Sequence, residues 1–426
     1  MKCALLLGAL AAGCGFDSPL LIENGPAAAG AGGNAGLGGT AGVGGTAGDG
    51  GATPIGGTGG SAGSVSDAAT DAPIAPDASV PENLVFAVGE YSACAIVHGT
   101  TYCWGAKTDW GTDFRPAPVR VDVPEALVQI AAGRAHACGI SGSGAVYCWG
   151  DNATAQLGSR DPASSGPIRV GLPAPAKKIT CGSGHNCAIL EDSTLWCWGN
   201  NSESQLGTAE LDLGPIVATP TQVGIASDYL DASGGDGHSC ALRAPGALYC
   251  WGRNSAAQLG LGTRVPGQAV TPLRVGTDTD WVAISSAQEG SCGKKRDGRL
   301  VCWGNDLEGR IGAGGGLVLS PVPIGDALYT SVATSTFHTC GVRADKSLFC
   351  QGRNVEGQLA AGNFDPVLGM TRALGTGSLE VGVGRFHTCV RDENEHLLCA
   401  GKNDVGQLGL GDTQRRAQLT LVPLGY

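Results

Sequence analysis

The chain has 426 residues, of which 72 are Gly and 22 are Pro, and only 15% of its residues are charged. This composition excludes a long-helix or coiled-coil protein and leaves strands and turns, or partial disorder. The formal net charge of −11 offers no positive surface for phosphate backbones, so no nucleic-acid partner is expected.

The first residues resemble a bacterial lipoprotein signal peptide. Lys2 precedes an apolar run over residues 4–12, and small residues then lead to Cys14. The run is too short to span a bilayer. The resemblance implies a signal peptide over residues 1–13, acylation of Cys14, and a place in the bacterial cell envelope, at the outer membrane or cell surface. An ordinary secretory leader cut near Ala12 is the alternative, and export is expected under either interpretation.

Residues 14–82 have the composition of a flexible tether. Gly, Ala and Thr recur loosely over residues 24–64, and residues 65–81 add Asp and Pro. With almost no large side chain, such a segment cannot bury a core. We expect it to hold a domain formed by residues 83–426 away from the membrane surface.

From residue 83 the chain repeats one unit of about 49 residues seven times, a length typical of propeller blades. Each unit reads as an apolar strand, a hairpin with two cysteines, a Gly-Gln-Leu-Gly-like turn and a Pro-containing strand. This pattern predicts an all-β fold. The cysteine pairs are Cys94 and Cys103, Cys138 and Cys148, Cys187 and Cys197, Cys240 and Cys250, Cys292 and Cys302, Cys340 and Cys350, and Cys389 and Cys399.

The spacing of the cysteines predicts one disulfide in each hairpin. Pairing Cys187 with Cys197 places Ala188 opposite Trp196 and leaves a loop over residues 191–193, whereas the first unit leaves the shorter loop 98–99. Directly opposed residues have Cβ atoms about 4.5 to 5.5 Å apart, close enough for a bond after small adjustment. Besides Cys3 and Cys14, this accounting leaves Cys181 as a buried free thiol.

Several motifs resemble repeats of the regulator of chromosome condensation family. They include Trp-Gly-Asp-Asn at residues 149–152 with Gln-Leu-Gly at 156–158, and matching pairs at 198–207 and 251–260. The resemblance covers the chain after the tether and implies a seven-bladed β-propeller. It implies little about function, because propellers host many activities. The family's founder is a nucleotide exchange factor for a small nuclear GTPase, which an exported, disulfide-bonded chain would not meet.

Histidines and tryptophans recur at fixed places in the units. Five histidines stand two residues before a first cysteine, but the first and fifth units carry Ser92 and Gly290 there. A zinc site would rarely lose a ligand in this way, so we expect structural histidines that bond backbone groups, and no metal or cofactor. The tryptophans after the second cysteines are expected to pack between neighbouring sheets. They are Trp104, Trp149, Trp198, Trp251 and Trp303.

The remaining candidates concern binding. Trp110 in the irregular loop of the first unit, with Asp109, Asp113 and Phe114, forms a candidate contact patch, although a buried loop anchor is the alternative. Loops that vary between units are further candidates. They cover residues 159–166, 208–218, 263–270, 313–319 and 361–370.

The sequence contains no familiar catalytic motif, so we expect no enzyme. The favoured hypothesis is a lipid-anchored, non-enzymatic scaffold that binds a protein or a surface polymer. An enzyme inhibitor is one alternative. Another is an extracellular polysaccharide hydrolase or lyase, which would need Arg and carboxylates at inner-strand ends that read Ala, Gly and Ser. Exchange-factor activity is the third.

The two ends of the domain are expected to meet. The first unit begins abruptly with an inner strand over residues 84–88, and the last unit ends with a strand over residues 417–424. We expect both segments in the same blade sector, because closure of the ring removes exposed sheet edges.

Overall fold

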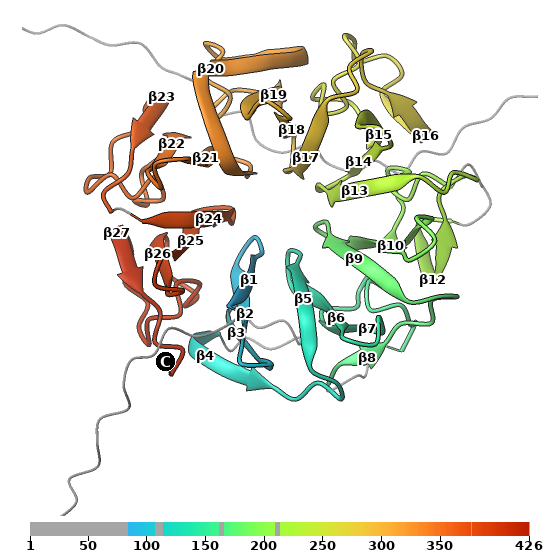
Figure 1. The fold of residues 1–426 in the computed structure, drawn as a ribbon, viewed down its shortest axis with the longest axis horizontal. Coiled ribbons are helices and arrows are strands. Elements are labelled where there is room, and N and C mark those ends of the chain that lie inside the picture. Colours follow the sequence, from blue (N-terminus) through green and yellow to red (C-terminus); the bar gives the residue numbers. More distant parts are fainter. Residues whose placement is uncertain (1–83, 107–113, 162–165, 209–213, 376, 426) are drawn as a thin grey trace, which may run out of the picture. The chain divides into compact units, whose positions relative to one another are not determined.

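The computed structural model describes residues 84–106, 114–161, 166–208, 214–375 and 377–425. In these ranges the chain forms strands and turns without a helix, and therefore no helix that could cross a membrane. The strands group into seven antiparallel blades of four (Figure 1). One strand, β20, is shared, because residues 317–328 pair with β19 and residues 329–334 pair with β21.

Blades 1 to 4 each contain four strands that are consecutive in sequence. They are β1 (Val85–Val88), β2 (Ser92–Val97), β3 (Thr100–Gly105) and β4 (Arg115–Val121); β5 (Leu127–Ala132), β6 (His136–Ser141), β7 (Val146–Gly150) and β8 (Ile168–Arg169); β9 (Ala176–Cys181), β10 (His185–Leu190), β11 (Leu195–Asn200) and β12 (Ile216–Gln222); and β13 (Tyr229–Gly234), β14 (His238–Arg243), β15 (Ala247–Arg253) and β16 (Gln268–Arg274).

Blades 5 to 7 follow the same order. Their strands are β17 (Trp281–Ser286), β18 (Gly290–Lys295), β19 (Arg299–Asn305) and β20 (Leu317–Thr334); β21 (His338–Arg343), β22 (Leu348–Gly352) and β23 (Val367–Arg372) after the second part of β20; and β24 (Ser378–Val383), β25 (His387–Asp392), β26 (Leu397–Gly401) and β27 (Arg416–Leu421).

The first strand of each blade lies nearest the central axis (Figure 1). These inner strands contact one another in sequence around the ring, and β24 of blade 7 contacts β1 of blade 1. The predicted all-β, seven-bladed fold is therefore confirmed.

The predicted hairpin register is also confirmed. Cys187 lies opposite Cys197 and Ala188 lies opposite Trp196, while in blade 1 the pairing runs to Val97 and Thr100. Each blade has its two cysteines at disulfide distance. The described part of the chain has one further cysteine, Cys181, which is unbonded as predicted but is half-buried at the channel wall and not fully buried.

A Trp-Gly pair joins neighbouring blades. Trp198 is fully buried, and its Nε1 donates to the carbonyl of Gln156 in the preceding blade at 3.0 Å. Gly199 has φ of 107° at the irregularity between β11 and β12, and a Cβ there would lie 2.6 Å from the carbonyl oxygen of Gly184. Trp104, Trp251 and Trp303 make the same bond to the preceding blade, so the predicted packing role is confirmed.

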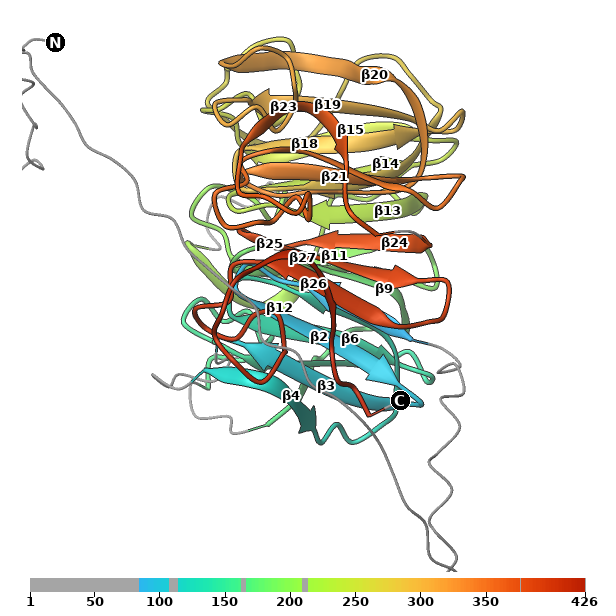
Figure 2. The same cartoon turned by 90° about the vertical axis from the view of Figure 1, so that its left-hand side faces the viewer.

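The prediction for the ends of the domain is partly wrong. Figure 2, an edge-on view, shows β2 and β3 in blue and β4 in teal below β24 to β27 in red, and the two sets form different sheets. β27 pairs with β26 in blade 7, whereas β1 pairs with β2 in blade 1, so the ends lie in different blades. The reason is that the first unit has its own outer strand, β4. The ends still meet, because Leu84 and Phe86 pack in one cluster with Val422 and Leu424.

Candidate functional site

The inner strands of all seven blades end at one mouth of the central channel. The turn after each strand lines a cavity of about 220 Å³, and the last lining residue of each turn has a polar or charged side chain. We call these residues the mouth ring. They are Glu90, Arg134, Ser183, Asp236, Gln288, Thr336 and Arg385.

Small residues precede the mouth ring because the turns approach one another closely. A Cβ on Gly182 would lie 2.5 Å from the carbonyl oxygen of Gly235 in the next blade and 2.3 Å from the ring of His185. The backbone N–H of Ser183 donates to that same Gly235 carbonyl at 3.0 Å. The Ala-Gly strand ending recognised in the sequence is therefore a packing requirement at the channel wall.

The polar groups of the mouth ring are partly paired. Ser183 Oγ donates to Glu90, and Thr336 Oγ1 donates to Gln288 Oε1 at 3.3 Å. Arg134 is exposed and, among the described residues, has no ion-pair partner. The ring thus places two carboxylates and two guanidinium groups around one cavity.

Three aromatic residues extend the mouth on one side only. Tyr91, Phe337 and Phe386, which we call the aromatic arc, follow the mouth ring residues of the consecutive blades 1, 6 and 7. Phe337 and Phe386 stack with ring centroids 4.9 Å apart and an angle of 16° between the rings. The equivalent residues of the other four blades are Ala135, Gly184, Gly237 and Glu289.

Three cations lie over the aromatic arc. The guanidinium of Arg353 lies 5.4 Å from the centroid of Phe337, that of Arg385 lies 5.5 Å from Phe386, and Lys402 Nζ lies 5.2 Å from Phe386. Arg385 also donates to the Tyr91 hydroxyl at 2.8 Å. The Nε atoms of Arg353 and Arg385 are buried and, within the described ranges, have no hydrogen-bond partner.

This cluster has the composition of a protein-binding hot spot. Aromatic and Arg side chains are enriched where interfaces carry most of their binding energy. The two stacked phenylalanines and the three cations over them are all half-buried, which restricts their rotamers before a partner binds. These residues are Phe337, Phe386, Arg353, Arg385 and Lys402. Acidic neighbours balance the cations, since Glu308 lies 3.6 Å from Arg353 and Asp404 lies 2.8 Å from Lys402.

Four of the five recurring histidines, all except His387, form a hydrogen bond with a side chain of the next blade. His185 Nε2 lies 2.8 Å from Ser239 Oγ of the next blade, and His338 Nε2 lies 2.8 Å from Thr388 Oγ1. Burial lowers the pKa of each ring, to about 3 for His185 and His338. The structural role expected from sequence fits these contacts, but the partner is a side chain of the next blade and not a backbone group.

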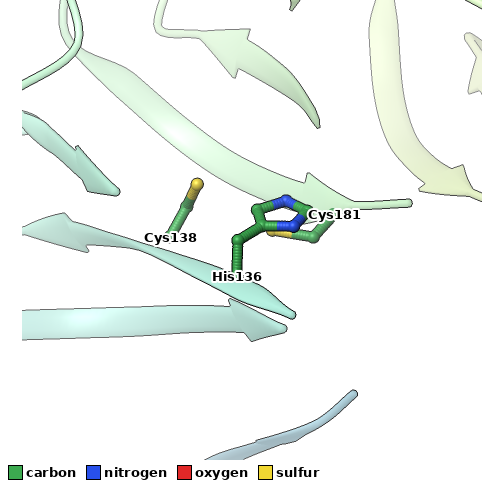
Figure 3. A group of neighbouring side chains, drawn as sticks. All are labelled: His136, Cys138 and Cys181. Carbon is green, nitrogen blue, oxygen red and sulfur yellow. The ribbon is translucent and has the colours of Figure 1, made fainter. Parts of the chain in front are cut away.

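One histidine lies in a cluster of possible metal donors. The donor atoms of His136, Cys138 and Cys181 all lie within 4.8 Å of one another (Figure 3). Cys138 is joined to Cys148, however, so its sulfur is not available as a thiolate. Burial raises the pKa of the Cys181 thiol and lowers that of His136. Two neutral donors fall short of a zinc site, and we interpret the group as packing between blades 2 and 3.

Comparison with known families agrees with this architecture. A model of the regulator of chromosome condensation (RCC1) repeat matches residues 127–156, 176–205, 231–258 and 380–407. A second RCC1-repeat model matches residues 143–189, 192–242 and 245–293. The chain contains RCC1 repeats.

Individual relatives support the same family and fold. The chain is 30% identical over 124 residues to the regulator of chromosome condensation of Mus musculus, covering 28% of this chain and 30% of the relative. It is 31% identical over 248 residues to the probable E3 ubiquitin-protein ligase HERC6 of Homo sapiens, covering 54% of this chain and 19% of that relative. The chain therefore spans less than a third of either curated relative.

A solved structure extends the likeness to most of the propeller. Yeast RCC1 (Prp20), crystallised with Kap60, has a TM-score of 0.67 and 19% identity, covering 76% of this chain and 83% of that one. At this identity the likeness concerns the fold alone.

Of the binding residues predicted for this RCC1-repeat protein, the structure describes Phe114 and parts of the variable loops. Phe114 is 43% exposed just before β4, the outer strand of blade 1. Asp109, Trp110, Asp113 and Cys14 lie outside the described residues. The variable loops follow the third strand of each blade. That strand ends on the face of the channel mouth, since Gly150 at the end of β7 pairs with His136, the residue with which β6 begins after the turn at the mouth.

Sequence reasoning missed the aromatic arc. Its members lie in different units, and Tyr91 is separated from Phe386 by almost the whole domain. Aligning the seven units at their first cysteines would have revealed aromatic residues three positions earlier in only three of them. The turns after four inner strands also supply charged groups to the cavity, which the Ala, Gly and Ser strand ends did not indicate; they are Glu90, Arg134, Asp236 and Arg385.

Proposed function

We propose that this RCC1-repeat protein is a non-enzymatic scaffold that binds another protein with the face around its channel mouth. The aromatic arc with its three cations is the observation that carries the proposal. RCC1-repeat propellers are commonly binding scaffolds, and yeast RCC1 was crystallised bound to Kap60 with this fold. The asymmetry of the arc favours a partner seated over blades 6, 7 and 1.

The proposal includes export and attachment to a bacterial envelope through Cys14. Its support is the leader sequence over residues 1–14 together with the paired cysteines. Seven cysteine pairs at bonding distance suit an oxidising compartment, because disulfides are rare where thiols are kept reduced.

Comparative capture from envelope extracts tests the binding face. The wild-type protein is compared with a Phe337→Ala and Phe386→Ala double variant, and with a Val128→Ala and Leu230→Ala control at exposed inner-strand positions. We expect one envelope protein to bind the wild type and the control, and to bind the double variant at least about 30-fold more weakly, since hot-spot truncation costs about 2 kcal/mol or more.

Two results would contradict this function. Equal capture by the double variant would place the interface elsewhere, and binding that survives protease treatment of the extract would indicate a surface polymer. Thermal melting of each variant serves as the folding control.

A polysaccharide hydrolase or lyase is the second candidate, favoured by the charged residues of the mouth ring. Glu90 and Asp236 come from blades 1 and 4 and line the same cavity, with Arg134 and Arg385. This candidate predicts release of sugar fragments from an extracellular polysaccharide by the wild type and none by Glu90→Gln or Asp236→Asn. Fragment release that persists in both variants would rule out a catalytic role for these carboxylates.

A further inference from the structure

A second cavity lies in the seam between blades 5 and 6, apart from the channel mouth. Its volume is about 310 Å³. Its walls include the apolar side chains of Ile324, Leu368 and Met370 together with Tyr329, Gln351 and Arg343. Leu368 at the rim is 73% exposed.

The cavity adjoins a position where this chain departs from its own repeat. Gln351 stands where four other blades carry a buried tryptophan that bonds to the preceding blade. Gln351 Nε2 keeps that bond, donating to the Arg310 carbonyl at 2.9 Å. The side chain of Gln351 also lies against the same glycine of the preceding blade's turn. A Cβ on Gly312 would lie 3.0 Å from Gln351 Oε1, and a Cβ on the equivalent Gly260 would lie 2.8 Å from the Trp303 ring.

The glutamine replaces the hydrogen bond of the tryptophan but not its indole ring. An aromatic ring from outside the chain can therefore occupy space that an aromatic ring fills in the neighbouring seams. Gln351 Oε1 has no hydrogen-bond donor within the structure's described ranges and can accept one from a ligand.

The other end of the cavity holds a cation that lacks its usual partner. In blades 4 and 5 the residue three positions after the first cysteine is also basic, and each pairs with a carboxylate. Arg243 lies 2.6 Å from Asp228, and Lys295 lies 2.6 Å from Asp280. Those acids directly precede the first residue of the inner strand, where blade 6 has Leu328.

Arg343 packs against aromatic rings and forms no ion pair with a described carboxylate; Asp345, two residues later in the chain, interacts with it only at longer range. Its guanidinium lies 3.5 Å from the centroid of Phe349 and 5.7 Å from that of Tyr329. Its Nε is buried without a hydrogen-bond partner, and none of the described carboxylates, including Asp326 on the cavity wall, forms an ion pair with it. A guanidinium in this setting favours an anionic group, above all a carboxylate that can accept two parallel hydrogen bonds.

We propose that the blade 5–6 seam binds a small aromatic carboxylate. The ring lies beside Gln351 against the apolar wall, and the carboxylate pairs with Arg343. Ligand pockets commonly have volumes of roughly 300 to 1,000 Å³, so this cavity suits a small free molecule better than a protein segment. The site is independent of the channel mouth and of the proposed scaffold function.

Titration calorimetry of the full chain with indole-3-acetate tests the proposal. We expect measurable binding below about 1 mM, and at least about tenfold weaker binding by Arg343→Gln. Gln351→Trp restores the residue of the other blades, and should abolish binding while raising the melting temperature. Arg243→Gln, which removes the paired cation of blade 4, is the matched control and should leave the affinity unchanged.

Indole without the carboxylate should bind more weakly than indole-3-acetate and should not respond to Arg343→Gln. Absence of binding at about 1 mM, or unchanged affinity in both the Gln351→Trp and Arg343→Gln variants, would overturn the proposal. Tighter binding of a peptide that ends in Trp than of indole-3-acetate would also overturn it, in favour of a docking site for a protein terminus. If Gln351→Trp fails to fold, the Arg343→Gln comparison decides the matter alone.

Discussion

Trp104 in blade 1 donates its indole N–H to the backbone carbonyl of Gln407 in blade 7, at 3.1 Å across 303 residues of sequence. The same bond joins blades that are neighbours in sequence, such as Trp251 to Gln205 at 2.8 Å. The ring therefore closes with a contact that also links blades 2 and 3, 3 and 4, and 4 and 5, and it needs no strand exchanged between the two ends.

This contact predicts a difference between two otherwise similar substitutions. Trp149 is buried like Trp104, but its Nε1 has no hydrogen-bond partner in the part of the chain that the structure describes. Trp104→Phe replaces the indole with a smaller ring and removes a hydrogen bond, whereas Trp149→Phe only replaces the indole with a smaller ring. We expect Trp104→Phe to lower the free energy of unfolding by about 1 kcal/mol more, measured by urea denaturation. Equal losses would show that the closing bond contributes nothing.

Gly290 and Arg310 are two departures from the repeat with one cause. A Cβ on Gly290 would lie 2.4 Å from Arg310 Nη2, so the guanidinium fills the space that a histidine takes in other blades. Arg310 replaces the glutamine of the usual turn, and its Nη1 donates to the Ser335 carbonyl at 3.0 Å.

We expect Gly290→His alone to destabilise the protein by about 2 to 3 kcal/mol, as overpacking does. Adding Arg310→Gln should recover part of that loss. The rescue is expected to be partial because the new Cβ also approaches the Trp303 carbonyl oxygen at 2.6 Å. A double-mutant cycle in urea should give a coupling energy of at least about 1 kcal/mol, and additive losses would contradict the shared cause.

These two residues show where sequence reasoning stops. The hairpin register could be predicted because it is local, so that Cys187 and Cys197 fix it by their spacing and loop length. The seven-bladed ring followed from counting units. Gly290 and Arg310 lie in different segments of their unit, and only the fold shows that they occupy one space. The same limit hid the aromatic arc, whose members meet across three blades.

Cys181 should be unreactive in the folded protein. Its thiol packs near Cys138, and burial raises its pKa, so little thiolate exists at neutral pH. In a chain with Cys3→Ser and Cys14→Ser, we expect a thiol reagent to label no cysteine natively and one after denaturation without reductant. Peptide mapping should assign the label to Cys181. Native labelling, or a bond from Cys181 to Cys138 or Cys148 at neutral pH, would contradict this environment.

The lipid anchor can be tested separately from the fold. We expect Cys14→Ser to remove partitioning into detergent and the diacylglyceryl mass that the wild type carries at that residue. Deleting residues 24–75 should leave the melting temperature of the propeller unchanged within about 1 °C, because such a segment buries no core. A mature N-terminus other than Cys14 would contradict the anchor, and a large loss of stability would contradict the tether.

The buried histidines should make the propeller sensitive to mild acid. Burial lowers the pKa to about 3 for His185, His238 and His338 and to about 4 for His387, against about 6.5 in an unfolded chain. Between these values the unfolded state binds more protons than the folded state. Stability is therefore full above about pH 6.5 and falls as the pH drops, by roughly 2 kcal/mol for each such histidine at pH 5.

Urea midpoints at about pH 7.5, 6 and 5 would measure this dependence, in a window above the titration of most carboxylates. Hydrogen bonds, the strongest from Ser143, hold the pKa of Glu125 at about 2, so its contribution is complete above about pH 4.5 and is lost as the pH falls from there towards 2. His387→Gln is the sharpest variant, because within the described residues neither ring nitrogen of His387 has a hydrogen-bond partner that the change would remove. It should reduce the slope of stability against pH by about one proton, and an unchanged slope would mean that His387 is protonated in the folded protein.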